Sequence, residues 1–138
     1  MRWSINGRFA ISSITSKVDD NSGDEICRIK IWDQVDQTFY DDLGKSSGVI
    51  LKKFIYVLAA HPIQEDILMS GSEGGLLILW NLKTKQALKR FEQYGVYSVD
   101  AGVMDNPLDG KWSPDGRAFV TGNNCGTITL YSCEDKKH

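Results

Sequence analysis

The residues of this chain that could do chemistry are few and lie far apart. Three cysteines, Cys27, Cys125 and Cys133, form no Cys-x-x-Cys pair, and the only histidines are His61 and His138. A structural zinc site draws its four ligands from closely spaced local pairs. We therefore predict no metal site and interpret the cysteines as small apolar strand residues, with a metal or redox role as the alternative.

Groups for general acid–base or nucleophilic catalysis are equally scattered. The adjacent carboxylates Asp19-Asp20 and Asp41-Asp42 fall in expected loops, where we interpret them as solvated. Gly74-Gly75 lacks the lysine and the strand-to-helix setting of a phosphate-binding loop. No histidine lies near the hydroxyls expected on second strands, where such groups satisfy buried backbone; these are Ser12, Ser70 and Thr121. We predict a non-enzyme with no catalytic residue, no cofactor and no small-molecule substrate.

The composition is that of a folded protein with little net charge. Hydrophobic residues make up 41% and charged residues 25% of the 138 positions, and 16 basic against 18 acidic residues give a net charge of −2. Such a balance does not draw a chain to nucleic acid or to an anionic membrane. The apolar runs are of strand length and the N-terminus has no signal-peptide pattern. We expect an intracellular protein that uses neither nucleic acid nor membrane as a partner.

The elements that position these residues come from a repeat. The segment Trp3-Ser4-Ile5-Asn6-Gly7-Arg8 recurs 109 residues later as Trp112-Ser113-Pro114-Asp115-Gly116-Arg117, and a short apolar segment with Ser or Thr follows each copy. Asn6-Gly7 is a frequent dipeptide of tight primed hairpin turns, in which both central residues have positive φ. His61-Pro62 marks a third, weaker copy. Self-similarity of this kind predicts a repeat architecture.

Alternating strands that end in an aromatic residue give the repeat its period. They end at Trp32, Trp80 and Tyr131, with spacings of 48 and 51 residues. A four-stranded propeller unit usually spans about 40 to 45 residues, so each unit is expected to carry an insertion. In the first unit we place it at 15–25, an acidic stretch of small residues typical of a surface loop.

The pattern predicts an all-β protein with three units. Unit one covers 1–47, with strands starting at or before Met1 and at 8–13, 27–32 and 37–40; unit two covers 48–91, with strands at 54–58, 67–72, 76–80 and 86–91; unit three covers 92–138, with strands at 108–113, 118–122 and 127–132. We expect the apolar linker 92–106 to pack on a sheet face. The third unit has no fourth strand.

These units resemble WD repeats. Ser113-Pro114-Asp115-Gly116, Met69-Ser70-Gly71-Ser72 and Ile29-Lys30-Ile31-Trp32-Asp33 match successive pieces of that repeat, as does Leu77-Ile78-Leu79-Trp80-Asn81. The resemblance implies four-stranded antiparallel β-propeller blades. No Gly-His pair precedes any innermost strand and the usual turn Asp is missing, so we interpret Trp32 and Trp80 as core fillers rather than members of a complete hydrogen-bonded tetrad.

A narrower resemblance is to the last blades of the bromodomain-and-WD-repeat family. The matching pieces are 56–62, 70–75, 109–116 and 126–131. That family has a nuclear propeller before chromatin-reading modules, and the propeller is thought to recruit partners that include cullin-RING ubiquitin ligase components. The resemblance implies a nuclear protein; without it, we would place the chain in the cytoplasm. None of the reading modules lies in this chain.

Three blades form an incomplete propeller. Rings close with about four to eight blades, because each sheet buries both faces against its neighbours. A face of four strands covers on the order of 300 Å², and two such faces are left open here. Either the chain is part of a longer propeller or two copies form a homodimer that completes six blades; the two are compatible.

The function that follows is that of a protein-interaction scaffold. Inter-strand loops on a rigid scaffold are where partners dock. We select Asn6, Arg8, Asp115 and Arg117 as partner-binding residues, because they fall in equivalent turns on one rim; solvated turn residues are the alternative interpretation. The alternative functions are a purely architectural role in a larger complex and recognition of a histone tail or nucleic acid.

Overall fold

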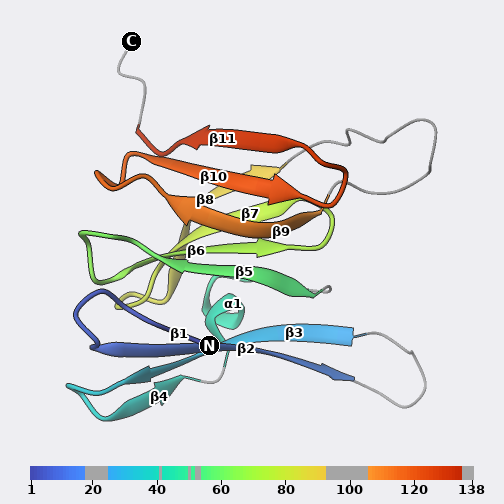
Figure 1. Ribbon diagram of the computed structural model, residues 1–138. Helices are drawn as coiled ribbons and strands as arrows, with labels where there is room; N and C mark the ends of the chain where they lie inside the picture. The colour runs from blue at the N-terminus through green and yellow to red at the C-terminus, as the bar shows by residue number, and fades with distance from the viewer. Residues whose placement is uncertain (18–24, 41, 50, 52–53, 93–105, 135–138) are drawn as a thin grey trace.

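Three antiparallel sheets stacked one upon the next make up the described part of the chain (Figure 1). The computed structural model describes residues 1–17, 25–40, 42–49, 51, 54–92 and 106–134. The sheet orders are β1-β2-β3-β4, β5-β6-β7-β8 and β11-β10-β9, so strands that follow one another in sequence pair with one another. The prediction of an all-β, incomplete propeller with three antiparallel blades is confirmed.

The strands lie close to their predicted places. The first sheet contains β1 (Arg2–Trp3), β2 (Phe9–Lys17), β3 (Glu25–Asp33) and β4 (Thr38–Tyr40); the second contains β5 (Ile55–Ala60), β6 (Ile67–Ser72), β7 (Leu76–Asn81) and β8 (Gln86–Glu92); the third contains β9 (Pro107–Trp112), β10 (Ala118–Asn123) and β11 (Ile128–Ser132). Within the described residues the third sheet has three strands, as the sequence predicts.

The predicted surface loop 15–25 is wrong at both of its ends. Thr15 pairs with Cys27 and Lys17 with Glu25, so the hairpin of β2 and β3 continues into the acidic stretch. Thr15 suits a strand because it is β-branched, and its hydroxyl lies 3.1 Å from the buried Cys27 sulfur. The rest of this loop, 18–24, and most of the linker expected to pack on a sheet, 93–105, lie outside the described residues.

A short helix, α1 (Leu43–Ser46), is the element that the sequence did not predict. Asp42 caps it by accepting a hydrogen bond from the Gly44 N–H at 3.1 Å, and Leu43 is fully buried in the core between the first two sheets. Four residues are too few to show helical periodicity. They are also far too few for α1, the only helix among the described residues, to cross a membrane.

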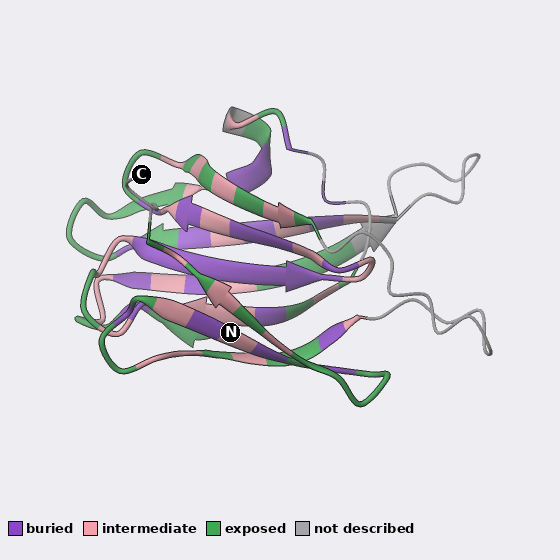
Figure 2. Ribbon diagram, turned by 90° about the horizontal axis from the view of Figure 1, so that it is seen from above, coloured by how far each residue is buried: buried purple, intermediate pink, exposed green. Residues whose placement is uncertain are grey.

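The core lies in two layers, one on each side of the second sheet. Its central strand, β6, is buried over its whole length, and Figure 2 shows burial concentrated along the strands and exposure on the turns. Between the first and second sheets the fully buried large side chains are Phe9, Ile11, Ile29, Ile31, Leu43, Leu68, Ile78, Trp80 and Leu82; between the second and third lie Val57, Met69, Leu77 and Phe119. Burial on both faces explains why β6 and β7 read as nearly continuous apolar runs.

The three repeat aromatics occupy one structural position. Trp32 pairs with Ala10, Trp80 with Leu68, and Tyr131 with Phe119. At this position the side chain points to the sheet that comes before it in the chain, which is why Trp80 packs into the first core layer and Tyr131 into the second. The interpretation of Trp80 as a core filler is confirmed.

The same interpretation is wrong for Trp32. Its side chain is 45% exposed, whereas that of Trp80 is fully buried. No described sheet covers the corresponding face of the first sheet, where Trp32 contacts Phe39 at a ring-centroid distance of 6.2 Å. Burial at this position therefore depends on the neighbouring sheet and not on the residue type.

Half of the WD hydrogen-bond chain is present in the second sheet. The Trp80 Nε1–H donates to Ser70 Oγ at 2.8 Å, so Ser70 satisfies an indole rather than the expected backbone group. Thr121 occupies the equivalent place on β10, yet its buried hydroxyl has no hydrogen-bond partner, because Tyr131 has no indole N–H to offer. Ser12, half-buried on the open face, makes no side-chain hydrogen bond with described residues. The prediction that these hydroxyls satisfy buried backbone groups is therefore wrong.

Candidate functional site

The two copies of the repeated segment fold into the same turn. Two hydrogen bonds join Ser4 to Phe9: the Ser4 N–H donates to Phe9 O at 2.9 Å, and the Ser4 Oγ accepts from the Phe9 N–H at 3.0 Å. Ser113 and Ala118 repeat this pattern at 2.8 and 3.0 Å. The serine hydroxyl thus holds each turn to the start of the next strand.

A glycine closes both turns. Gly7 has φ +68° and Gly116 has φ +72°, a region that L side chains enter only at a cost, and each N–H donates to the serine carbonyl at 2.9 Å. The φ of Asn6 is not positive, so the expectation of a primed turn with two positive φ angles is wrong. Of the two positions, only the glycine has the positive φ that the sequence predicts.

The corresponding turn of the second blade, 61–66, uses a histidine in place of the serine. The His61 N–H donates to Ile67 O at 3.0 Å, at the place where the Ser4 and Ser113 N–H groups bond to their own following strands. The turns 4–8, 61–66 and 113–117 lie on the same side of the stack, at the left of Figure 1. We call these three turns the interaction rim.

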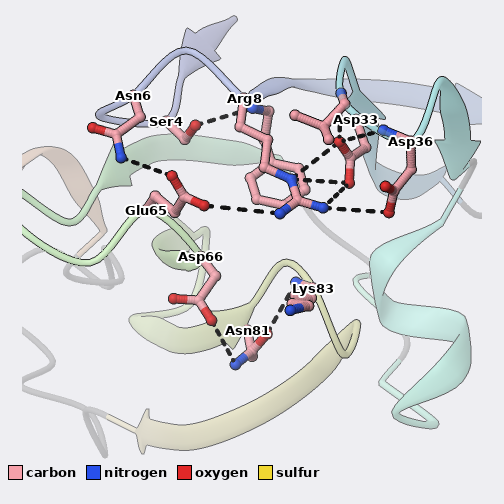
Figure 3. Close-up of polar contacts among 11 residues, drawn as sticks. Ser4, Asn6, Arg8, Asp33, Asp36, Glu65, Asp66, Asn81 and Lys83 are labelled. Carbon is pink, nitrogen blue, oxygen red and sulfur yellow. Dashed lines mark hydrogen bonds and ion pairs between the residues drawn. The ribbon is translucent and has the colours of Figure 1, made fainter.

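Arg8 joins the first two turns of the interaction rim (Figure 3). Its guanidinium contacts both carboxylate oxygens of Asp33, with Nε–Oδ1 at 3.1 Å and Nη2–Oδ2 at 2.9 Å, and reaches Asp36 at 3.3 Å and Glu65 at 3.8 Å. The Asn6 Nδ2 donates to the other Glu65 oxygen at 2.7 Å. Glu65 belongs to the β5–β6 turn, so Asn6 and Arg8 tie the first blade to the second.

The carboxylate of Asp33 is the acceptor around which this cluster forms. Besides Arg8, it accepts from the backbone N–H groups of Val35 and Asp36, at 2.9 and 3.2 Å. The hydrogen bond from Arg8, followed by these backbone bonds, lowers the pKa of Asp33, although burial opposes the shift. The same hydrogen bond raises the pKa of Arg8. The pair is thus charged on both sides at neutral pH, and a bidentate geometry fixes it.

His61 joins the second and third turns. Its Nδ1 accepts the N–H groups of Ile63 and Gln64, at 3.1 and 2.9 Å, so the hydrogen is on Nε2, which donates to the Gly116 carbonyl at 3.1 Å. The buried ring also packs edge-on against Trp112 with centroids 4.6 Å apart. His61 therefore holds the second blade to the third by one side chain.

Asp115 and Arg117 are the accessible members of the interaction rim. Asp115 Oδ1 accepts from the Ser113 hydroxyl at 2.5 Å and from the Arg117 N–H at 3.1 Å, and these bonds lower the pKa of Asp115. The Arg117 side chain is 71% exposed, with its Nε 3.1 Å from Glu134, itself largely exposed. Both charges point to solvent from a turn whose backbone is fixed.

The structure thus places the four predicted residues in two equivalent turns and gives the two pairs different surroundings. Asn6 and Arg8 bind neighbouring turns, while Asp115 and Arg117 face solvent. Sequence reasoning missed Asp33, Glu65 and His61, which are separated from their partners by 25 to 59 residues. The Asp that ends the Ile-x-Ile-Trp-Asp strand was the one available signal.

No arrangement for metal or redox chemistry occurs in the part of the chain that the structure describes. Among these residues, no three His, Cys, Asp or Glu side chains form a group that could hold a metal ion. Cys27 is buried, Cys125 is exposed on a turn, and Cys133 is half-buried with a pKa that burial raises. A raised pKa disfavours the reactive thiolate.

Stacked antiparallel sheets of three or four strands, following one another in chain order, form an incomplete β-propeller whose sheets resemble WD-repeat blades. No family model matches the chain. A bromodomain and WD repeat-containing protein of Dictyostelium discoideum is 27% identical over 129 residues, which is 94% of this chain and 5% of that protein. The resemblance to bromodomain-and-WD-repeat proteins is confirmed, and the chain spans about one twentieth of the relative's length.

A solved structure shares the fold. The hydrazine synthase of Kuenenia stuttgartiensis superposes with a TM-score of 0.60 at 18% identity, over 95% of this chain and 31% of that one. At this identity the likeness concerns the arrangement of the strands and carries no information about activity.

Proposed function

We propose that this chain is part of a non-enzymatic protein-interaction scaffold and that it docks a protein partner on the interaction rim. The observation that carries the proposal is the exposed Asp115–Arg117 pair on a turn held by Ser113 and, through Gly116, by His61. A loop that is fixed before binding loses little conformational entropy when a partner arrives. Charged groups in such a place select a partner by complementarity.

The two pairs of rim residues have different roles in this proposal. Arg117 offers its guanidinium to a partner carboxylate, which replaces Glu134, and Asp115 accepts from a partner donor. Asn6 and Arg8 act as positioning residues, because their bonds to Glu65 fix the first turn against the second. The name of the Dictyostelium relative supports a nuclear, chromatin-associated setting, and we extend the proposal to recruitment of a ubiquitin-ligase substrate in that setting.

Alanine variants at the rim test the docking role. We expect Arg117→Ala to leave the unfolding midpoint unchanged, and Asp115→Ala to lower it slightly because the bonds from Ser113 and from the Arg117 N–H are lost. Both variants are expected to abolish capture of a partner from nuclear extract, whereas Lys83→Ala, a matched exposed charge on another turn, keeps capture. If both variants retain every partner, the docking role on this rim is wrong and an architectural role is favoured. Capture of a histone peptide or of nucleic acid in place of a folded protein would change the class of partner.

We also propose that other blades cover the two open sheet faces. One face carries Trp3, Trp32 and Phe39, and the other carries Ile128 and Leu130, all of them largely exposed. In the isolated 138-residue chain, a second copy can supply both missing contacts, because a twofold pair of three-blade units closes a ring of six. Light scattering at micromolar concentration then gives twice the chain mass. A monomer that melts cooperatively at these concentrations overturns the homodimer.

A further inference from the structure

The Asn6-Gly7 pair in the first turn of the interaction rim can undergo a reaction that the docking role does not use. The carboxamide of an asparagine is open to attack by the backbone nitrogen of the next residue, and a glycine there has no side chain to hinder the approach. Asn6 is exposed, and a Cβ added to Gly7 meets nothing within 4 Å. The pair lies between β1 and β2, where the Gly7 N–H donates to Ser4 O at 2.9 Å. The turn thus leaves both reacting groups accessible once this bond opens.

The equivalent turn of the third blade already carries the acid that this reaction would produce. Asp115 stands in the repeated segment where the first copy has Asn6. Asp115 Oδ1 accepts from the Ser113 hydroxyl at 2.5 Å and from the Arg117 N–H at 3.1 Å, so its own turn binds the carboxylate. An aspartate therefore fits this turn and is held there by groups that the turn itself supplies.

In the first turn the carboxamide is bound to another blade instead (Figure 3). The Asn6 Nδ2 donates to Glu65 Oε2 at 2.7 Å, in the turn between β5 and β6. The Ser4 hydroxyl and the Arg8 N–H stand at the places of the two donors that bind Asp115. A carboxylate at position 6 has no hydrogen to donate to Glu65 and is repelled by it. Conversion of the amide to the acid thus favours the arrangement of the third blade, in which residue 6 is bound within its own turn.

We propose that Asn6 is a site of spontaneous deamidation and that Glu65 slows the reaction by holding the carboxamide on the second blade. The Gly7 nitrogen attacks Asn6 Cγ and forms a succinimide ring, while the Cγ–Nδ2 bond breaks and ammonia leaves with the hydrogen of the Gly7 N–H. Water then opens the ring at either carbonyl. The products are aspartate and isoaspartate, which has an additional methylene group in the backbone.

The expected consequence is a weaker side-chain link between the first two turns of the rim and one more negative charge there. Of the contacts that Asn6 and Arg8 make with Glu65, only the 3.8 Å contact of Arg8 remains. The apolar layer between the two sheets contains none of these residues, so the blades stay stacked. Because the ammonia is lost, the change does not reverse and accumulates with the age of the protein. This chemistry does not depend on the docking role proposed above.

Peptide mapping by mass spectrometry of the full 138-residue chain, aged at mildly alkaline pH, tests the proposal. The mass increase of amide-to-acid conversion is expected at Asn6 well before Asn124, an exposed turn asparagine that cysteine follows. We expect Glu65→Ala to speed the reaction at Asn6 about three- to tenfold, the factor that one hydrogen bond of ordinary net strength supplies. Asp66→Ala removes the neighbouring carboxylate of the same turn, which bonds to Asn81 instead, and is expected to leave the rate unchanged.

The variant Asn6→Asp supplies the aspartate product directly and tests the consequence. We expect it to fold, and we expect Glu65→Ala to lower the unfolding midpoint of the native chain but not that of Asn6→Asp. An equal lowering in both backgrounds overturns the proposed loss of the link between the turns.

The ageing experiment decides the site and the role of Glu65. Conversion at Asn6 that Glu65→Ala accelerates and Asp66→Ala does not supports the proposal. No conversion at Asn6 in the native chain or in Glu65→Ala overturns it, and so do equal rates in these two proteins. Equal acceleration by Asp66→Ala overturns the role of Glu65, because it shows a general loosening of the turn. Unfolding midpoints show that each variant is folded, and since partner capture is not measured, failure here leaves the docking proposal standing.

Discussion

The contact between His61 and Gly116 makes the junction of the second and third blades sensitive to a single methyl group. A Cβ built on Gly116 lies 2.2 Å from both Cε1 and Nε2 of the His61 ring, while a Cβ on Gly7, at nearly the same φ, meets nothing within 4 Å. The two glycines close equivalent turns. Gly116→Ala and Gly7→Ala therefore share the backbone cost and differ in the clash.

The expected magnitudes follow from that difference. An alanine in the left-handed region costs about 1–2 kcal/mol, which is the whole effect expected for Gly7→Ala. Gly116→Ala also displaces a ring that makes three hydrogen bonds, with the Gly116 carbonyl and with the N–H groups of Ile63 and Gln64. At about 1 kcal/mol each, with part of the loss recovered by water, the displacement adds about 2–3 kcal/mol.

Urea unfolding of four variants measures the effect and tests its cause. The expected loss of unfolding free energy is about 3–5 kcal/mol for Gly116→Ala and about 1–2 kcal/mol for Gly7→Ala. In a His61→Ala background the clash is gone, so Gly116→Ala is expected to cost no more there than Gly7→Ala does in the native chain. If Gly116→Ala costs the same with and without His61, or if both glycine variants lose equally, the reasoning about this junction is refuted.

Three further predictions test the core and the rim. Trp80→Phe removes the indole N–H bound by Ser70 and leaves a small cavity, so we expect a loss of about 2–3 kcal/mol in unfolding free energy. For Trp32→Phe on the open face we expect a loss of about 0.5 kcal/mol. Equal losses would contradict the inference that the neighbouring sheet determines burial at this position. Thr121→Val replaces an unpartnered buried hydroxyl by a methyl group, and chemical unfolding is expected to show no loss or a gain of about 1 kcal/mol; a clear loss would mean that the hydroxyl is bonded. The folded-state pKa of Asp33 is lowered below 3.8, so the contribution of Asp33 to stability is complete above that pH and is lost as the pH falls through the folded-state pKa. Below about pH 4, the unfolding midpoint of Asp33→Asn is expected to depend less on pH than that of the unsubstituted chain. Parallel profiles of midpoint against pH for the two proteins would refute this.

Local patterns predicted the strands well because each strand carries its own signal. β6 and β7 are apolar runs bounded by Gly and Asn, and the repeated segment places a glycine at the one turn position with positive φ. The helix α1 could not be predicted, because its stability comes from the burial of Leu43 in a distant core and not from a periodic pattern. The ends of β2 and β3 were missed because the polar composition of 15–25 is typical of a loop, whereas the pairing of Thr15 with Cys27 is visible only in the structure.

The candidate site was predicted only as far as local turns allow. Asn6, Arg8, Asp115 and Arg117 follow from the repeat, but the repeat does not say that Arg8 is bound by Asp33 while Arg117 faces solvent. That difference depends on contacts between blades, such as Glu65 with Asn6, which join residues far apart in sequence. The repeat predicts the position of a residue within its blade, but the contacts and exposure of its side chain depend on the adjacent blade.

The two blade junctions on the rim show how different the contacts at equivalent positions can be. Both rest on an apolar layer made by equivalent strand positions, yet the first is closed by the charged residues Arg8 and Glu65 and the second by His61 against a backbone carbonyl. The Arg8–Glu65 ion pair, 3.8 Å long and only partly buried, adds little stability and weakens in salt, whereas the buried His61 ring has both nitrogens bonded and is rigid. The third turn is thus the more firmly held of the two outer turns, and the side chains it projects, Asp115 and Arg117, are the ones presented to solvent. The part of the rim that is best fixed is also the part whose charged side chains are most exposed, and this supports the proposal that a partner docks there.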